Sequence, residues 1–314
     1  MTNIRGDEPR LVKSIKYRLP FHVGQLGRLY QYEPRPMQVA ARPQLTLPPG
    51  TTWPSIAMVT PSYNQAQYLE QTIKSVLDQG YPALEYVVQD GASKDASPHI
   101  IERYKDKLTY SESAPDSGQT NAINKGFRHT RGEIMAWLNS DDMLLPGTLQ
   151  LVGKFFAEHP EVDVVYGHRI IVDENSYEIG RWVLPQHGNR ILSFADYIPQ
   201  ETLFWRRSVW DKAGGQVDEQ FKFAMDWDLI LRLRDVGARF VRLPYFMAAF
   251  RVHAAQKTSA QITDIGFQEM NKLRSRCQGG RRVGQTETYL NTRLFMYTHF
   301  VYATLYLMGI LKYD

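Results

Sequence analysis

The sequence predicts an α/β fold whose sheet is mainly parallel and is covered by helices on both faces. Short apolar runs of strand type alternate along the chain with segments in which apolar residues recur at helical spacing. Glycine and proline fall between these segments, where turns are expected. Regular alternation of strand and helix is typical of a parallel sheet, because each parallel connection needs a crossover. The composition is that of an ordinary globular chain, since 43% of the 314 residues are hydrophobic and 22% are charged.

The first half of the alternating region begins with a strand at residues 55–61, an unbroken apolar run that ends in proline. Leu69, Ile73 and Val76 then mark one face of a helix, which Gly80 ends. Continued in the same way, the pattern predicts a strand at 84–90, a helix capped by Ser97 and opened by Pro98, a strand at 107–113, a helix at 122–129, a strand at 133–138 and a helix at 146–160 begun by Pro146. These four strands form the expected parallel part of the sheet.

The second half is less regular, and strands dominate it. The pattern predicts strands at 162–173, 178–185, 201–207 and 239–253, and one helix at 226–237 with Leu229, Ile230 and Leu233 facing inward. Together the two halves define one domain over residues 53–260.

Residues 1–52 form an N-terminal extension that is basic at first and then rich in proline. Proline fixes φ and removes a backbone donor, so the second half of the extension is expected to be an extended linker or to wrap the domain surface. Residues 11–19 have two open interpretations: a short basic amphipathic helix that touches acidic lipid, or a solvated arm folded onto the domain. The N-terminus has no apolar stretch of signal-peptide length, so export by that route is not expected.

Residues 261–314 are predicted to form a C-terminal helical segment. Within it, residues 294–311 contain no Asp, Glu, Lys or Arg and reach the lower limit of about 17 to 25 residues for a bilayer span. Polar and aromatic side chains make the stretch amphiphilic rather than uniformly apolar. Two interpretations therefore stay open: a helix packed against the domain, or a helix that lies in a membrane interface.

Net charge and cysteine content limit the partners and the compartment. The net charge of +4 suits an anionic ligand or an anionic membrane surface but is small for a nucleic-acid-binding domain, so no nucleic-acid partner is expected. The single cysteine, Cys277, excludes an intrachain disulfide and a cysteine-based metal cluster. We expect a cytoplasmic protein, peripheral at the inner face of the membrane if its terminal segments contact lipid.

Polar residues follow each of the first four predicted strands. Ligands of open α/β sheets bind beyond the carboxyl ends of the strands, so these residues are expected along one edge. They are residues 60–64, 90–95, 116–119 and 139–142. Each group alone is also compatible with an ordinary turn or helix cap.

Asp141 and Asp142 are the expected ligands of Mg²⁺ or Mn²⁺, because adjacent carboxylates repel each other unless a cation joins them. A metal held by few carboxylates completes its coordination with water and with substrate phosphates, which indicates a nucleotide ligand. Neither a P-loop nor a dinucleotide-binding glycine motif follows a predicted strand. The phosphates are therefore expected to meet the metal and isolated basic groups such as Lys125, Arg251 or Lys257.

A resemblance to a known family is carried by six blocks in chain order: TPSYNQAQYLEQTIKSVLDQ, VVQDGASKD, PDSGQTNAINKG, WLNSDD, MDWDLILRL and RVHAAQKT. Over residues 53–260 the chain resembles the family 2 glycosyltransferases of the GT-A fold. The resemblance implies a Rossmann-like mixed sheet flanked by helices, a divalent metal, and transfer of a sugar from a nucleotide-diphospho-sugar with inversion at the anomeric carbon.

The resemblance also implies roles for residues at matching positions. It implies a nucleotide site formed by Pro61, Tyr63, Asn64, Asp90, Asp116, Gly118, Asn124, Asn139 and Ser140, to which we add Lys125 as a basic group. It implies metal ligation by Asp141 and His253, with Asp142 beside them, and general-base catalysis by Asp226. Trp205 and Trp227 are candidates for stacking on a sugar, although tryptophan commonly packs in the core, and Gln200 and Glu201 complete the expected sugar or acceptor site.

Two positions depart from the family pattern. Asn139 replaces the usual first aspartate of the D-x-D motif, and Met225 replaces the glutamate before the base. Asn139 can still offer a carbonyl oxygen and Asp142 can supply charge, so weakened metal binding is expected rather than none. Asp226 also suits a helix start, and His253 also suits a buried position between apolar neighbours, so structural roles stay open for both.

The predicted function is transfer of a sugar, with UDP as the expected nucleotide, to a hydroxyl of a glycan or lipid-linked acceptor in cell-surface polysaccharide synthesis. Two alternatives stay open. A sugar-phosphate nucleotidylyltransferase would use the same kind of sheet, but the chain lacks the glycine-rich loop with Arg and Lys that such enzymes carry. A non-catalytic nucleotide-sugar-binding protein would explain Asn139 and Met225 directly.

Overall fold

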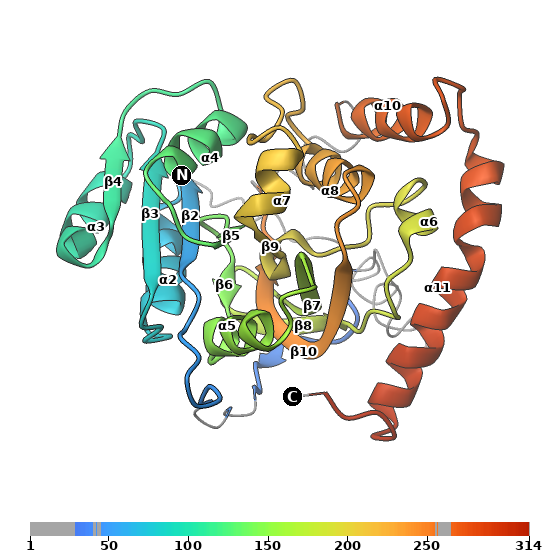
Figure 1. Ribbon diagram of the computed structural model, residues 1–314, viewed down its shortest axis with the longest axis horizontal. Coiled ribbons are helices and arrows are strands. Elements are labelled where there is room, and N and C mark those ends of the chain that lie inside the picture. Colours follow the sequence, from blue (N-terminus) through green and yellow to red (C-terminus); the bar gives the residue numbers. More distant parts are fainter. Residues whose placement is uncertain (1–28, 40–41, 43–44, 255, 257–264, 314) are drawn as a thin grey trace, which may run out of the picture.

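The computed structural model describes residues 29–39, 42, 45–254, 256 and 265–313 (Figure 1). Over this part of the chain it confirms the α/β class, with one mixed sheet of ten strands at the centre. The parallel half holds β5 (Ile134–Trp137), β2 (Ile56–Ser62), β3 (Leu84–Asp90) and β4 (Tyr110–Ser113), in that order. These are the four strands that the sequence predicts to be parallel.

The other half of the sheet is mostly antiparallel. Short β9 (Phe204–Arg206) joins the halves, pairing antiparallel with β5 on one side and with β7 (Val164–Val172) on the other. Antiparallel β8 (Tyr177–Trp182) follows β7, and β1 (Arg35–Pro36) lies at the edge. The long β10 (Phe240–Arg251) runs parallel to β7 and pairs antiparallel with β6 (Met143–Leu144).

Helices cover both faces of the sheet, as predicted. Because side chains alternate along a strand, Ala57 and Val59 of β2 face one layer while Ile56 and Met58 face the other. The first layer contains α4 (Gln119–Arg128), α7 (Arg207–Lys212) and α8 (Met225–Asp235). The second contains α2 (Ala66–Leu77), α3 (Ser97–Tyr104) and α5 (Thr148–Glu158). Short α6 (Asn189–Leu192) and the 3₁₀ turns η2 (Lys105–Lys107) and η3 (Gln200–Thr202) complete the domain.

Some element boundaries differ from the prediction. Ser97 is not the cap of α3 but its first residue, and the carboxylate of Asp95 accepts the Ser97 backbone N–H at 2.9 Å. Helix α5 begins at Thr148 rather than Pro146, after Gly147 in the left-handed region. Strands β1 and β6 are two residues long, too short to leave a periodic pattern in the sequence.

Part of the N-terminal extension lies on the domain. Strand β1 adds to the sheet beside β8, and the Arg42 guanidinium donates to the Thr148 hydroxyl at 3.2 Å. Residues 11–19, for which two interpretations were open, lie outside the described residues.

The C-terminal segment contains α10 (Phe267–Cys277) and the long α11 (Gln285–Leu307). Figure 1 shows α11 along one edge of the molecule. Its side chains that pack against the domain are Thr292, Phe295, His299 and Ala303. None of the described helices combines the length and the apolar content needed to span a bilayer.

Close approach of α4 to β2 depends on Gly126. A Cβ added at this position would lie 2.5 Å from Cγ1 of Val59, which is fully buried in the middle of β2. The glycine therefore lets the helix sit directly on the strand and fixes the height of α4 above the sheet.

We expect Gly126→Ala to lower the free energy of unfolding by about 1–3 kcal/mol, because the added methyl overpacks the contact with Val59. Chemical denaturation measures the change. The double variant Gly126→Ala/Val59→Ala supplies the control, because removing the Val59 methyls relieves the overlap. A double variant whose loss equals the sum of the two single losses would contradict the proposed contact.

Candidate active site

The loops that follow β2 and β3 are tied together at the carboxyl ends of the parallel strands. The Gly91 N–H donates to the Ser62 carbonyl at 2.9 Å. The Asn64 N–H donates to the Ser93 hydroxyl at 2.7 Å, and the Asn64 side-chain oxygen accepts the Lys94 N–H at 2.8 Å. The structure thus brings the expected nucleotide residues of both loops to one place.

The side chain of Asp90 holds the loops at this edge through hydrogen bonds. Its side chain is fully buried, and its carboxylate accepts hydrogen bonds from the Ser93 N–H at 2.9 Å and from the hydroxyls of Ser93 and Ser113, both at 2.6 Å. In this structure the carboxylate therefore holds the loops and is not open to a ligand. By contrast, Tyr63 is 63% exposed, while Pro61 is buried at the end of β2.

The loop after β4 closes onto the same edge. The Asp116 carboxylate accepts the Gly118 N–H at 2.8 Å, and a Cβ at Gly91 would lie 2.8 Å from an Asp116 oxygen. Gly118 has φ of +115°, in the left-handed region, so glycine suits this start of α4. Asp116 and Gly91 therefore approach each other as closely as the backbone allows.

Asn124 lies inside the protein rather than at the ligand edge. Its amide donates to the Val217 carbonyl at 2.9 Å and to Glu219 at 3.1 Å, and its oxygen accepts the Val217 N–H at 2.8 Å. These bonds fasten α4 to the loop that precedes α8. The role that the structure gives Asn124 is to position this loop.

The three basic groups expected to meet phosphates have different positions. Lys125 donates to the Pro115 carbonyl at 3.1 Å, close to Asp116. Arg251 is buried and donates to the Asp141 carbonyl at 2.9 Å and to Gln71 at 2.6 Å, so it is part of the fold. Lys257 lies outside the described residues.

Asp141 and His253 face each other at the end of β5. The Asp141 carboxylate oxygen Oδ2 lies 3.0 Å from His253 Nε2. Asp142 turns inward instead: it is 1% exposed, and its carboxylate accepts the Arg251 backbone N–H at 3.0 Å. Burial, and then the neighbouring charge of Asp141, raises the pKa of the Asp142 carboxyl well above its usual value. Ser140 is buried, and its backbone carbonyl accepts the Thr72 hydroxyl at 2.9 Å.

The donor set fits a hard divalent cation that shares its shell with substrate. No group of three or more His, Cys, Asp or Glu able to hold a metal occurs among the described residues. Two adjacent ligands, Asp141 and His253, match the way Mg²⁺ and Mn²⁺ combine few protein groups with water and phosphate oxygens. Asp142, by contrast, faces away from such a site.

Asp226 lies in the first turn of α8. Its carboxylate accepts the Trp227 N–H at 2.9 Å, and its pKa is raised by burial. The first turn of α4 touches both neighbours: the Gln119 amide donates to Asn139 at 2.7 Å, and the Thr120 hydroxyl contacts the Met225 sulfur at 2.9 Å. Asn139 belongs to the metal motif, and Met225 precedes the expected base Asp226. Both residues therefore contact the first turn of α4.

The other expected acceptor residues lie deeper. Glu201 is 3% exposed and forms a bidentate ion pair with Arg169, with both contacts at 2.6 Å. Gln200 donates to the Trp137 carbonyl at 2.8 Å. Trp205 and Trp227 have no exposed surface and pack in the core, so neither ring can stack on a sugar in this structure. The expectation for the tryptophans is corrected by their burial.

Asp196 is a candidate that the sequence pattern did not reveal. It is exposed to solvent, yet the surrounding protein raises the pKa of its carboxyl well above the usual value, first by desolvation and then through the charge of Asp226. The segment that carries it is held by Trp227, whose indole donates to the Leu192 carbonyl at 2.8 Å, and by Arg274, which donates to the Phe194 carbonyl at 2.8 Å. Asp196 lies in an irregular segment outside the family blocks, where no periodicity could point to it.

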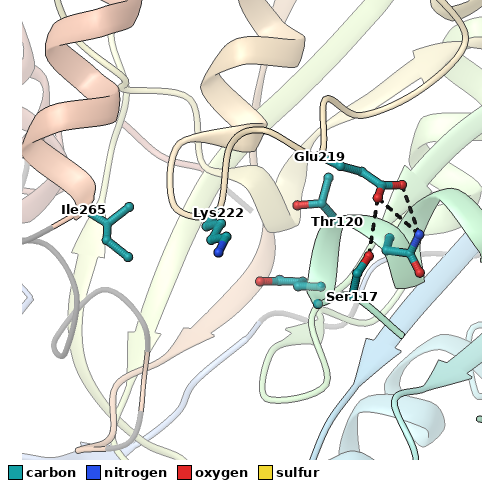
Figure 2. Close-up of a pocket in the computed structure, with 8 residues that line it drawn as sticks. Ser117, Thr120, Glu219, Lys222 and Ile265 are labelled. Atoms are coloured by element: carbon teal, nitrogen blue, oxygen red, sulfur yellow. Dashed lines mark hydrogen bonds between the residues drawn. The ribbon is translucent and has the colours of Figure 1, made fainter. Parts of the chain in front are cut away.

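A pocket of about 290 Å³ opens beside the start of α4. Figure 2 shows Ser117, Thr120 and Glu219 on one side of it and Lys222 and Ile265 on the other. Its lining consists of Ser117, Gly118, Gln119, Thr120, Asn121, Glu219, Lys222 and Ile265. Hydrogen bonds from Asn124 and Asn121 lower the pKa of Glu219, which keeps this carboxylate ionised at the pocket wall.

Comparisons with known proteins show that the chain is similar to glycosyltransferases. Residues 57–211 match the family model of glycosyl transferase family 2. The chain is similar to the uncharacterized glycosyltransferase Rv1514c of Mycobacterium tuberculosis, with 27% identity over 78% of this chain and 93% of that protein. It is also similar to the putative teichuronic acid biosynthesis glycosyltransferase TuaG of Bacillus subtilis, with 33% identity over 34% of this chain and 44% of that protein.

Two solved structures share the fold. One is TarS 1–349 of S. aureus in complex with UDP-GlcNAc, with a TM-score of 0.60, 20% identity, and coverage of 79% of this chain and 73% of that one. The other is the mannosyltransferase PcManGT of Pyrobaculum calidifontis in complex with GDP-Man and Mn²⁺, with a TM-score of 0.57, 18% identity, and coverage of 96% of this chain and 80% of that one. The predicted GT-A fold is confirmed.

We expect Asp196→Asn to raise the melting temperature at pH 8.5 and to leave it unchanged near pH 4. A carboxyl whose folded-state pKa is raised stabilises the fold while it is protonated and loses that contribution as the pH rises through the folded-state pKa. Asparagine keeps the neutral form at every pH, so its advantage appears only at high pH. Thermal melts at both pH values measure it, with the exposed Asp106→Asn as control. An equal effect at both pH values would show that Asp196 is not desolvated.

Proposed function

From the match of residues 57–211 to the family model of glycosyl transferase family 2, we propose that the chain transfers a sugar from a nucleoside diphosphate sugar to a hydroxyl of a glycan or lipid-linked acceptor. UDP is the proposed nucleotide, since TarS was solved with UDP-GlcNAc, although PcManGT was solved with GDP-Man. Relatives named for teichuronic acid and O-antigen biosynthesis support a role in cell-surface polysaccharide synthesis.

The proposed donor site lies at the carboxyl ends of the parallel strands. Tyr63 offers an exposed ring on which a nucleobase can stack, and Asn64 and Asp116 lie in the loops of the same edge. Asp141 and His253 would hold the divalent cation next to the diphosphate. When bound there, the cation would offset the negative charge of the departing nucleoside diphosphate.

The proposed general base is Asp226. It would remove the proton from the acceptor hydroxyl while that oxygen attacks the anomeric carbon and the nucleoside diphosphate leaves from the opposite face, which gives inversion. Burial raises the pKa of Asp226, which moves its basicity toward that required of a base near neutral pH. The observation that carries the proposal is the first turn of α4, which touches Asn139 of the metal motif and Met225 beside the base.

The second candidate is a nucleotide-sugar-binding protein without transferase activity. The two departures from the family pattern, Asn139 and Met225, favour it. Met225 is buried and packs in the core, so it replaces a family carboxylate by an apolar contact next to Asp226. Incubation with Mn²⁺ and a panel of UDP-, GDP- and dTDP-sugars separates the two functions, because tight binding without transfer or slow hydrolysis would support the second.

Asp226→Asn is expected to lower kcat by about 10²–10⁴-fold, because the amide cannot accept the acceptor proton. Nucleotide affinity should stay at the wild-type value, because Asp226 lies at the start of α8 and is not in the loops proposed to hold the nucleobase. Radiolabelled sugar transfer and calorimetric titration with UDP measure the two effects. The half-buried Asp218→Asn variant, eight residues earlier in the chain, serves as control. Wild-type turnover in Asp226→Asn would remove this residue from the mechanism.

A membrane surface is the proposed location of a lipid-linked acceptor, and α11 is the proposed contact. Exposed apolar side chains recur along the side of α11 that does not pack on the domain: Tyr289, Leu290, Leu294, Met296, Tyr297, Leu307 and Met308. Arg293 and Lys312 lie within or beside this stretch, and Glu287 in the first turn of α11 is paired with Arg281. Exposed apolar and tyrosine side chains beside Arg293 and Lys312 suit an anionic lipid surface.

We expect the full chain to sediment with vesicles rich in phosphatidylglycerol and not with pure phosphatidylcholine vesicles. Leu294→Glu/Tyr297→Glu should reduce the bound fraction about tenfold, because two charges enter the apolar stripe. Val236→Glu, at another exposed apolar position, should bind as the wild type does. A stable dimer that the Leu294→Glu/Tyr297→Glu variant dissociates, without any vesicle binding, would contradict the membrane assignment.

A further inference from the structure

Asn139, which stands where the family pattern has an aspartate, connects three parts of the site. Its side-chain oxygen accepts the Gln119 amide of α4 at 2.7 Å. Its amide donates to Gln200 Oε1 of η3 at 3.2 Å and lies 3.4 Å from Asp142 Oδ2. The end of β5, the first turn of α4 and the η3 turn are therefore joined through one side chain.

The partners of Asn139 have fixed directions. Gln200 donates its own amide to the Trp137 carbonyl at 2.8 Å, which turns Oε1 toward Asn139. Asp142 uses one carboxylate oxygen to accept the Arg251 backbone N–H at 3.0 Å and presents the other to Asn139. Position 139 consequently faces two acceptors and one donor.

Among acidic and amide side chains of this length, only asparagine meets this demand. Its NH₂ group supplies donors and its oxygen supplies the acceptor, whereas an ionised aspartate only accepts. An aspartate at position 139 would keep the bond from Gln119 but would face the Gln200 oxygen and the Asp142 carboxylate without a donor between them. Gln200 is buried, so its oxygen would lose its hydrogen-bond donor without gaining one from water, which costs free energy.

We propose that Asn139 is a positioning residue that is required as an amide, and that restoring the aspartate of the family motif would weaken the enzyme instead of improving it. The inference rests on the proposed transferase function and deepens it. It explains the departure at position 139 through the neighbouring Asp142, which is buried where a second outward-facing metal carboxylate was expected. Asn139 thus supplies the hydrogen-bond donor and Asp142 the acceptor, at two positions three residues apart that face each other.

The test compares Asn139→Asp with the exchanged pair Asn139→Asp/Asp142→Asn. In the pair, the new amide at position 142 can donate to the carboxylate at position 139 and still accept the Arg251 N–H, so the bond between the two positions is restored in reverse. Gln200 Oε1 stays without its donor, so the recovery is partial. We expect Asn139→Asp to lower kcat about 10–100-fold at saturating donor and Mn²⁺, and the exchanged pair to recover about tenfold of that loss. Asn175→Asp adds the same charge on an exposed turn and should keep wild-type kcat.

Three readouts separate positioning from folding. Turnover is measured well below the lowest melting temperature, the Mn²⁺ concentration for half-maximal activity is titrated for each variant, and thermal melts are recorded alongside. Unchanged or higher kcat in Asn139→Asp, or an exchanged pair no better than the single variant, would overturn the inference. If the wild type transfers no sugar from any donor, the proposed function fails. The melting temperatures then decide the amide requirement, since Asn139→Asp must melt lower and the exchanged pair must recover.

Discussion

The buried guanidinium of Arg169 binds Glu201 and acts through its charge on three further carboxyls of the site, so it offsets much of the negative charge gathered there. Glu201 binds it through two contacts of 2.6 Å, and its charge lowers the pKa of Asp142, Asp196 and Asp226 against the effect of burial. The rings of Trp182 and Phe250 lie 4.6 and 4.4 Å from the guanidinium and exclude water. Without the positive charge of Arg169, the carboxyl groups of Asp142, Asp196 and Asp226 would repel one another in a poorly solvated region.

The mixed sheet is what brings these groups together. Parallel strands deliver the nucleotide loops and the Asn139–Asp142 turn to one edge, and α4 rises from that edge because Gly126 lets it lie on β2. Antiparallel β9 and the η3 turn before it then return the chain beneath the same edge, so that Glu201 meets Arg169 of β7. The acidic residues come from both halves of the sheet, and the ion pair lies where the halves join.

Periodicity predicted the fold well because long elements bury whole faces. The runs at β2, β3 and β10 and the helical spacing in α2 were sufficient, and the ordered blocks predicted the GT-A fold. Periodicity could not predict two-residue strands such as β6, whose existence depends on β10 a hundred residues later. Nor could it distinguish a tryptophan in the core from one at a ligand, or reveal Asp196, because these properties arise from tertiary packing.

The central claim is that the metal pair Asp141–His253 and the base Asp226 serve one substrate. A crystal structure of the Asp226→Asn variant with Mn²⁺ and an intact UDP-sugar tests it most directly, because the inert variant preserves the donor. The account predicts Mn²⁺ coordinated by Asp141, His253 and the diphosphate, with residue 226 facing the anomeric carbon from the side opposite the leaving group. A diphosphate bound away from Asp141, or an anomeric carbon turned away from residue 226, would contradict it.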